Sequence, residues 1–194
     1  MNIKIKIENE KAYIYTPYNK NFVQRIKKIR GIWNGNAWVV NYAFVPAVRE
    51  ILKDIYGYDD TDTEIETVTL RITFLESREE YHDDIRLFGK TIASAYGRDS
   101  GAKLGEDAAL IKGSAYSGGS VKNWRTIIDA GSVIILNNVP KIMYEKKKEL
   151  YNTEEIMIEV VEKDDEIDVN KLREEKERLL KRIAEIDRIL ATQG

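Results

Sequence analysis

Two glycine-rich polar segments, separated by a short apolar run, carry the residue types that bind phosphate groups. The first spans residues 97–105, the second spans residues 117–124, and the apolar run is residues 108–111. Glycines let the backbone turn N–H groups toward a ligand, and serine hydroxyls add further donors. The predicted ligand-binding residues are Arg98, Ser100, Lys103, Ser117, Gly118, Gly119, Ser120, Lys122 and Trp124.

These residue types favour a phosphate-bearing ligand, either a nucleotide or a nucleic acid. The cations would hold phosphate oxygens, and the indole of Trp124 would stack on a base. Two such loops on adjacent strands can converge on one ligand. Neither segment contains Gly-x-x-x-x-Gly-Lys-Ser/Thr or Gly-x-Gly-x-x-Gly, which argues against an ordinary nucleotide triphosphatase or dinucleotide enzyme. The alternative is that both segments are hairpin connections whose polar residues face water.

A metal-dependent phosphodiesterase is a second hypothesis, based on the acidic residues around the first segment. Asp99, Glu106 and Asp107 could hold Mg²⁺ for phosphodiester cleavage, with His82 as a base. However, no recognisable second set of ligands accompanies them, and the serines have no histidine neighbour to activate them. Asp99 is also suited to ordering its own turn. We therefore predict a non-catalytic protein with no metal site and no cofactor.

Charge is distributed unevenly along the 194-residue chain. Residues 1–57 carry a net charge of +6, residues 58–166 carry −9 and residues 167–194 carry +1. We call these segments the head, the body and the tail. A basic head favours nucleic acid as a partner. The acidic body gives a third hypothesis, a protein–protein adaptor or inhibitor that docks on a basic partner and mimics DNA.

The composition also constrains the location of the protein. There are no cysteines, which excludes a disulfide scaffold and a thiolate metal site and makes the cytosol the default compartment. No run of about 18 apolar residues is present, and the N-terminus alternates isoleucine with lysine instead of forming a signal-peptide core. We therefore expect a soluble, cytoplasmic protein with no membrane partner.

The pattern of the head predicts a ββαββα module. Residues 3–7 and 11–15 alternate as a hairpin, and residues 32–40 form a second hairpin around Gly35-Asn36. Asn19 can cap a helix that ends at Gly31, and Pro46 suits the first turn of a helix closed by Gly57. The polar side of the first helix and its end supply the predicted nucleic-acid-binding residues Lys20, Arg25, Lys27, Lys28 and Arg30.

Part of the head resembles a known module. Residues 15–18 read Tyr-Thr-Pro-Tyr, residues 26–31 end in an Ile-x-Gly pattern, and Trp33-Asn34 and Trp38 follow. This order is similar to the HARP-type module, which accompanies annealing-helicase motors and helps them engage branched DNA. The resemblance covers residues 15–38 and implies a DNA-facing role. No helicase motor follows, so motor activity is not implied. The alternative is that both tryptophans are core aromatics of a hairpin.

An acidic connector at residues 59–64 leads to the body, which we expect to be a mostly antiparallel sheet or barrel of about six strands. Strands are predicted over residues 65–74, 85–88, 91–96, 108–111, 132–136 and 156–161. The last should pair with the first, and Asn137-Asn138 reads as a turn. The two glycine-rich segments of the body resemble stretches of uncharacterised bacteriophage and prophage proteins. That resemblance implies no particular chemistry.

The tail has the heptad spacing of a coiled coil. Its apolar positions alternate steps of three and four residues from Val169 to Leu190, and Lys176 alone interrupts them. A helix this short is marginal alone, so we expect residues 169–190 to make the protein a homo-oligomer. A helix folded back onto the body is the competing interpretation. The predicted fold class is thus α+β, with head, body and a C-terminal coiled-coil helix.

The sequence therefore favours a non-catalytic accessory protein of a phage or mobile element that binds a phosphate-bearing ligand. By analogy, such proteins act by sequestration or blockade, for instance against a host defence system. A host defence protein is accordingly a further candidate partner.

Overall fold

The computed structural model describes residues 3–161 together with residues 178 and 179. It combines helices with antiparallel sheets, so the predicted α+β class is confirmed. Two separate hydrophobic clusters are present, one built from head residues between Ile3 and Tyr56 and one from body residues between Leu70 and Ile158. Among the described helices, none has the length and apolar character needed to cross a membrane.

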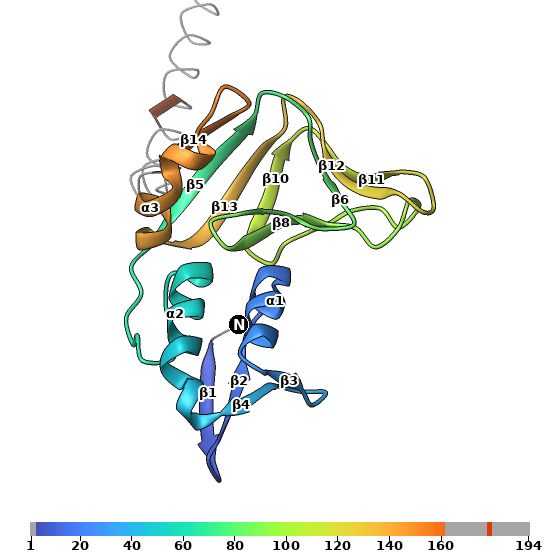
Figure 1. Ribbon diagram of the computed structural model, residues 1–194. Coiled ribbons are helices and arrows are strands. Elements are labelled where there is room, and N and C mark those ends of the chain that lie inside the picture. Colours follow the sequence, from blue (N-terminus) through green and yellow to red (C-terminus); the bar gives the residue numbers. More distant parts are fainter. Residues whose placement is uncertain (1–2, 162–177, 180–194) are drawn as a thin grey trace, which may run out of the picture. The chain divides into compact units, whose positions relative to one another are not determined.

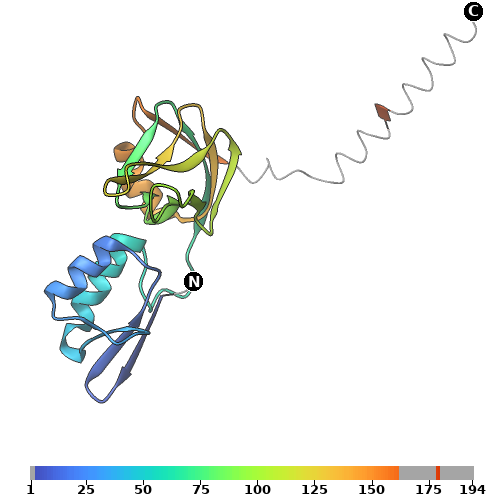
Figure 2. The same cartoon turned by 90° about the vertical axis from the view of Figure 1, so that its right-hand side faces the viewer.

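The head contains a four-stranded antiparallel sheet in the order β1-β2-β4-β3. Its elements in chain order are β1 (Lys4–Glu8), β2 (Lys11–Tyr15), α1 (Lys20–Lys28), β3 (Ile32–Trp33), β4 (Trp38–Asn41), a 3-10 turn (Tyr42–Phe44) and α2 (Val45–Tyr56). The predicted order ββαββα is confirmed, with the 3-10 turn added. Both helices contribute to one cluster with Ala12, Ile14 and Val40, so they cover the same face of the sheet (Figures 1 and 2).

Helix α1 begins where the sequence predicts and ends slightly earlier. The side chain of Asn19 accepts hydrogen bonds from the N–H groups of Asn21 at 2.9 Å and Phe22 at 3.1 Å, which caps the helix. The helix ends at Lys28, and Arg30 takes the left-handed conformation with φ of 64°. Gly31 is needed for close packing instead, because a Cβ there would lie 2.8 Å from the carbonyl oxygen of Ile26.

The body has ten strands in the described residues, more than the six or so that the sequence predicts, in sheets β10-β13-β5-β14, β11-β12-β6 and β7-β8-β9. Strand β14 neighbours β5, as expected. The strands are β5 (Thr67–Phe74), β6 (Arg78–Tyr81), β7 (Ile85–Leu87), β8 (Lys90–Ser94), β9 (Lys103–Leu104), β10 (Ala108–Lys112), β11 (Ala115–Gly119), β12 (Trp124–Ile128), β13 (Val133–Pro140) and β14 (Ile156–Val161).

Two features of the body differ from the prediction. Asn137 and Asn138 do not form a turn: they lie within β13, where the pairing with β5 shifts register between Leu136 and Val139. Asn138 has φ of 54°, typical of a residue in a β-bulge. Part of the second glycine-rich segment is strand instead of loop, because Ser117, Gly118 and Gly119 pair with β12.

A third helix, α3 (Lys141–Tyr151), follows β13 and includes a run of lysines at residues 146–148. Lys146 and Lys148 are exposed and Lys147 is half-buried. The predicted coiled coil at residues 169–190 lies outside the described residues, apart from residues 178 and 179, and stays a prediction.

Candidate nucleic-acid interface

The two glycine-rich segments of the body contact each other, and their convergence on a ligand stays a prediction. The backbone N–H of Gly101 donates to the hydroxyl oxygen of Ser117 at 3.0 Å. That hydroxyl in turn donates to the carbonyl oxygen of Arg98 at 2.7 Å. The first segment is therefore joined to strand β11 of the second by hydrogen bonds between their own groups.

Several donors that would hold a phosphate are occupied within the first segment. The hydroxyl oxygen of Ser100 accepts from the N–H of Tyr96 at 3.0 Å and lies 2.8 Å from the carbonyl oxygen of Gly101. The guanidinium of Arg98 pairs with the carboxylate of Asp99 at 2.7 Å. This hydrogen bond raises the pKa of Arg98 and lowers the pKa of Asp99. Asp99 thus stabilises its own turn and its neighbour.

The second segment is a hairpin whose glycines are explained by packing. Residues 120–123 form the turn, with the N–H of Asn123 donating to the carbonyl oxygen of Ser120 at 3.1 Å. Gly119 has φ of 86°, and a Cβ there would lie 2.2 Å from the carbonyl oxygen of Asn123. A Cβ on Gly118 would lie 2.8 Å from Cδ1 of Ile127. Neither glycine therefore requires a ligand to account for it.

The other predicted ligand-binding residues of the body contact neighbouring groups of the protein. The ring of Trp124 already packs on His82, with centroids 5.3 Å apart. The Nε2 of His82 lies 2.8 Å from the carbonyl oxygen of Lys122. The ammonium of Lys103 lies 6.0 Å from the ring of Tyr96. The alternative interpretation, hairpin connections facing water, accounts for these contacts.

Two of the three acidic residues of the phosphodiesterase hypothesis, Asp99 and Asp107, are held by other partners. Asp107 accepts from the ammonium of Lys90 at 2.5 Å and from the amide of Asn138 at 2.8 Å. Burial opposes ionisation of Asp107, but these two hydrogen bonds outweigh it and lower its pKa. Within residues 3–161 and 178–179, no three His, Cys, Asp or Glu side chains gather as a metal-binding group.

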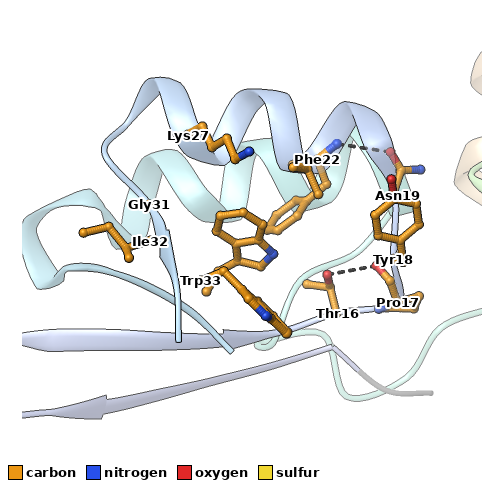
Figure 3. Close-up of a pocket in the computed structure, with 11 residues that line it drawn as sticks. Thr16, Pro17, Tyr18, Asn19, Phe22, Lys27, Gly31, Ile32 and Trp33 are labelled. Carbon is orange, nitrogen blue, oxygen red and sulfur yellow. Dashed lines mark hydrogen bonds between the residues drawn. The ribbon is translucent and has the colours of Figure 1, made fainter. Parts of the chain in front are cut away.

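A different feature, in the head, has the geometry of a binding site. A cavity of about 790 Å³ lies between helix α1 and the hairpin of β3 and β4 (Figure 3). Thr16, Pro17 and Tyr18 form one end of it, and Gly31 and Ile32 lie at the other. The volume falls in the range of sites for small organic ligands, which are mostly apolar with a few polar groups. We call this cavity the aromatic pocket, because Tyr18, Phe22, Trp33 and Trp38 line it.

The sequence periodicity explains why these side chains face one another. Within α1, Val23 and Lys27 are four residues apart, so they lie along one side of the helix, and both line the pocket. Trp33 pairs directly with Trp38 across the hairpin, which places both indoles on the same face of the sheet. Trp38 in turn pairs with Ile14, a fully buried residue under the helices. The indoles are therefore on the face of the sheet that α1 covers.

The pocket is open to solvent, and several of the large apolar side chains that line it are exposed. Tyr18 is 72% exposed, Ile32 is 71% exposed and Trp33 is 52% exposed. The ring centroids of Trp33 and Trp38 lie 5.6 Å apart with a 54° angle between the planes. Exposed apolar side chains that together line a cavity can mark an interaction site.

Two hydrogen bonds to the carbonyl oxygen of Pro17 fix one end of the pocket. The hydroxyl of Tyr56, at the end of α2, donates to the carbonyl oxygen of Pro17 at 2.8 Å. Burial raises the pKa of Tyr56 to about 12, so the phenol keeps its proton and remains a donor at neutral pH. The hydroxyl of Thr16 donates to the same carbonyl at 3.0 Å. The backbone that presents Tyr18 is thus held in one position.

The five basic residues predicted for nucleic acid divide into two groups. Arg25 hydrogen-bonds to Asp54 at 2.5 Å, and Lys20 pairs with Asp83 at 3.0 Å. Lys27, Lys28 and Arg30 are exposed and have no ion-pair partner among the residues that the structure describes. Lys27 lines the aromatic pocket itself. Three uncompensated cations therefore lie on or just after the helix that forms one wall of the pocket.

Sequence reasoning found the cations but did not assign a pocket. It treated Trp33 and Trp38 as part of a family resemblance or as core aromatics. The sequence does contain a pattern that could have indicated the pocket: a basic helix with an aromatic residue before it, Tyr18, and another after it, Trp33. Comparison of the chain with protein-family models, curated proteins and solved structures finds no match.

Proposed function

We propose that this protein binds nucleic acid without catalysing a reaction, and that the head is its binding surface. The observation that carries the proposal is the aromatic pocket beside Lys27, Lys28 and Arg30. Proteins that bind nucleic-acid strands combine positive charge for the phosphates with aromatic side chains for the bases. The head supplies both on one helix and the hairpin facing it. The resemblance of residues 15–38 to a DNA-facing module agrees with this role.

The setting in which the protein acts is proposed by analogy. The body segments resemble phage and prophage proteins, so we propose an accessory role in a phage or mobile element. Binding to a nucleic acid would let the protein sequester it or block access to it, for instance by a host defence protein. A homo-oligomer formed through residues 169–190 would add avidity to such binding.

The test is a titration of a fluorescently labelled oligonucleotide with the protein, followed by fluorescence anisotropy. Charge reversal at Lys27 or Lys28 should weaken binding, because each change replaces an attraction for phosphate with a repulsion. Lys4→Glu is the matched control. Lys4 pairs with Tyr15, the residue after the inward-facing Ile14, so it lies on the opposite face of the head sheet.

We expect Lys4→Glu to bind as the unaltered protein does, apart from a small long-range charge effect. Equal loss in all three variants would show that only overall charge matters and would contradict the assignment to the pocket side. Absence of binding to both single-stranded and duplex oligonucleotides would refute the proposed function altogether.

A further inference from the structure

We infer that the aromatic pocket receives an unpaired base, so that the head selects single-stranded or locally unpaired nucleic acid over duplex. This inference rests on the proposed function and specifies its ligand. Three features of the pocket support it: the aromatic side chains of its walls, its position between α1 and the β3–β4 hairpin, and the cations beside it.

The walls of the pocket suit the flat face of a ring. Trp33 and Trp38 contribute indoles from the sheet, and Tyr18 contributes a phenol at one end. In a duplex, neighbouring bases cover each base's two faces, and only its edges are displayed in the grooves. A pocket lined by aromatic rings, which bind a base by stacking on its face, can therefore take a base only after that base has left the stack.

The position of the pocket also disfavours a paired base. The cavity lies between α1 on one side and the β3–β4 hairpin on the other (Figure 3). A base that still carries its pairing partner would have to bring the second strand between those two walls. An unpaired base attached to one flexible backbone meets no such obstacle.

Charge complementarity identifies the occupant as a nucleotide and not an apolar protein side chain. Lys27 lies on the same side of α1 as Val23, and both line the pocket. Lys28 and Arg30 follow within one turn and are exposed. A strand whose base occupies the pocket would carry its flanking phosphates past these cations, where each phosphate gains a favourable interaction.

The experiment compares three ligands of one sequence: a single strand, the corresponding duplex, and a single strand with several abasic sites. The proteins are the full chain, Trp33→Ala and Trp33→Phe. Trp33 is half-exposed, so we expect Trp33→Ala to fold, and a thermal melt verifies this. Tyr42→Ala is the matched control, because Tyr42 is an exposed aromatic residue of the head that does not line the pocket.

We expect Trp33→Ala to weaken binding of the ordinary single strand by about 5- to 150-fold, the range found for loss of one stacking contact. Trp33→Phe should retain most of the affinity, and Tyr42→Ala should retain all of it. The loss caused by Trp33→Ala should disappear on the abasic strand, because the base that Trp33 contacts is missing. The duplex should bind more weakly than the single strand.

Two results would overturn the inference and leave the proposed function standing. One is equal binding of single strand and duplex, with the same sensitivity to Lys27→Glu. The other is unchanged oligonucleotide binding by Trp33→Ala, which would show that no base stacks on Trp33 in the pocket. By contrast, if none of the three ligands bound, the proposed function itself would be refuted.

Discussion

The dependence of binding on salt offers a quantitative test of which cations touch nucleic acid. Three of the five predicted basic residues, Lys27, Lys28 and Arg30, are exposed and uncompensated in the described part of the chain. Each phosphate neutralised on a single strand changes the slope of log K against log salt by about −0.7, so three contacts give a slope of about −2. Raising salt from about 50 to 200 mM should then weaken binding about 20-fold.

Removing one of these cations should change the slope by a defined amount. Lys27→Ala leaves two contacts and should reduce the slope to about −1.4, which corresponds to a loss of about 7-fold over the same salt range. Arg25→Gln is the matched control, because the Arg25 guanidinium already hydrogen-bonds to Asp54 at 2.5 Å. Its slope should stay near that of the unaltered protein.

The assay is a series of anisotropy titrations with a single-stranded oligonucleotide at four or more salt concentrations. A full slope for Lys27→Ala would show that Lys27 makes no phosphate contact and would contradict the prediction. The prediction would also be contradicted if Arg25→Gln reduced the slope as much as Lys27→Ala does. In that case the ion pair with Asp54 would not predict which cations are available.

Two further predictions concern stability, one at a glycine that packs closely and one at a partly buried ion pair. Gly31→Ala should lower stability by about 1–3 kcal/mol in thermal or urea unfolding, because the new Cβ would overpack against Ile26. Gly97→Ala, where a Cβ meets nothing within 4 Å, should be nearly neutral, and equal losses would contradict the packing argument. Asp107→Asn should cost roughly 1–2 kcal/mol at neutral pH by weakening the bonds to Lys90 and Asn138. The pKa of Asp107 is lower in the folded protein than its ordinary value of 3.8. The stability that its carboxylate contributes is therefore present above pH 3.8 and is lost as the pH falls through the folded pKa. The difference between Asp107→Asn and the unaltered protein should therefore shrink below about pH 3.8, and a difference that persists in acid would contradict the assignment.

The head could be predicted well because its signals are local. Asn19 caps a helix with a regular apolar face, and Gly35 supplies the positive φ that the hairpin turn needs. The register of that hairpin also placed Trp33 opposite Trp38. What the sequence could not show is that the space between α1 and the hairpin stays open, because that depends on how far the helix packs over the sheet.

The body was harder to predict because several of its strands depend on tertiary contacts. Ser117, Gly118 and Gly119 have the composition of a loop, yet they pair with β12 and Gly118 packs against Ile127. Strand β9 has two residues, too few for an alternating pattern. The two glycine-rich segments are joined directly by the hydrogen bond between Gly101 and Ser117. Residue types alone could not show that the hydroxyls of Ser100 and Ser117 donate to backbone carbonyl oxygens of the first segment.

The central claim, that nucleic acid binds at the head pocket, can be tested directly by tryptophan fluorescence. The chain has three tryptophans, two in the pocket at positions 33 and 38 and one in the body at position 124. Trp124→Phe leaves only the pocket indoles, and the double variant Trp33→Phe/Trp38→Phe leaves only the body indole. Both are titrated with single-stranded oligothymidylate. We predict saturable quenching in Trp124→Phe and none in the double variant, because the base stacks on a pocket indole. Quenching confined to the double variant would place the ligand at the body segments and contradict the account.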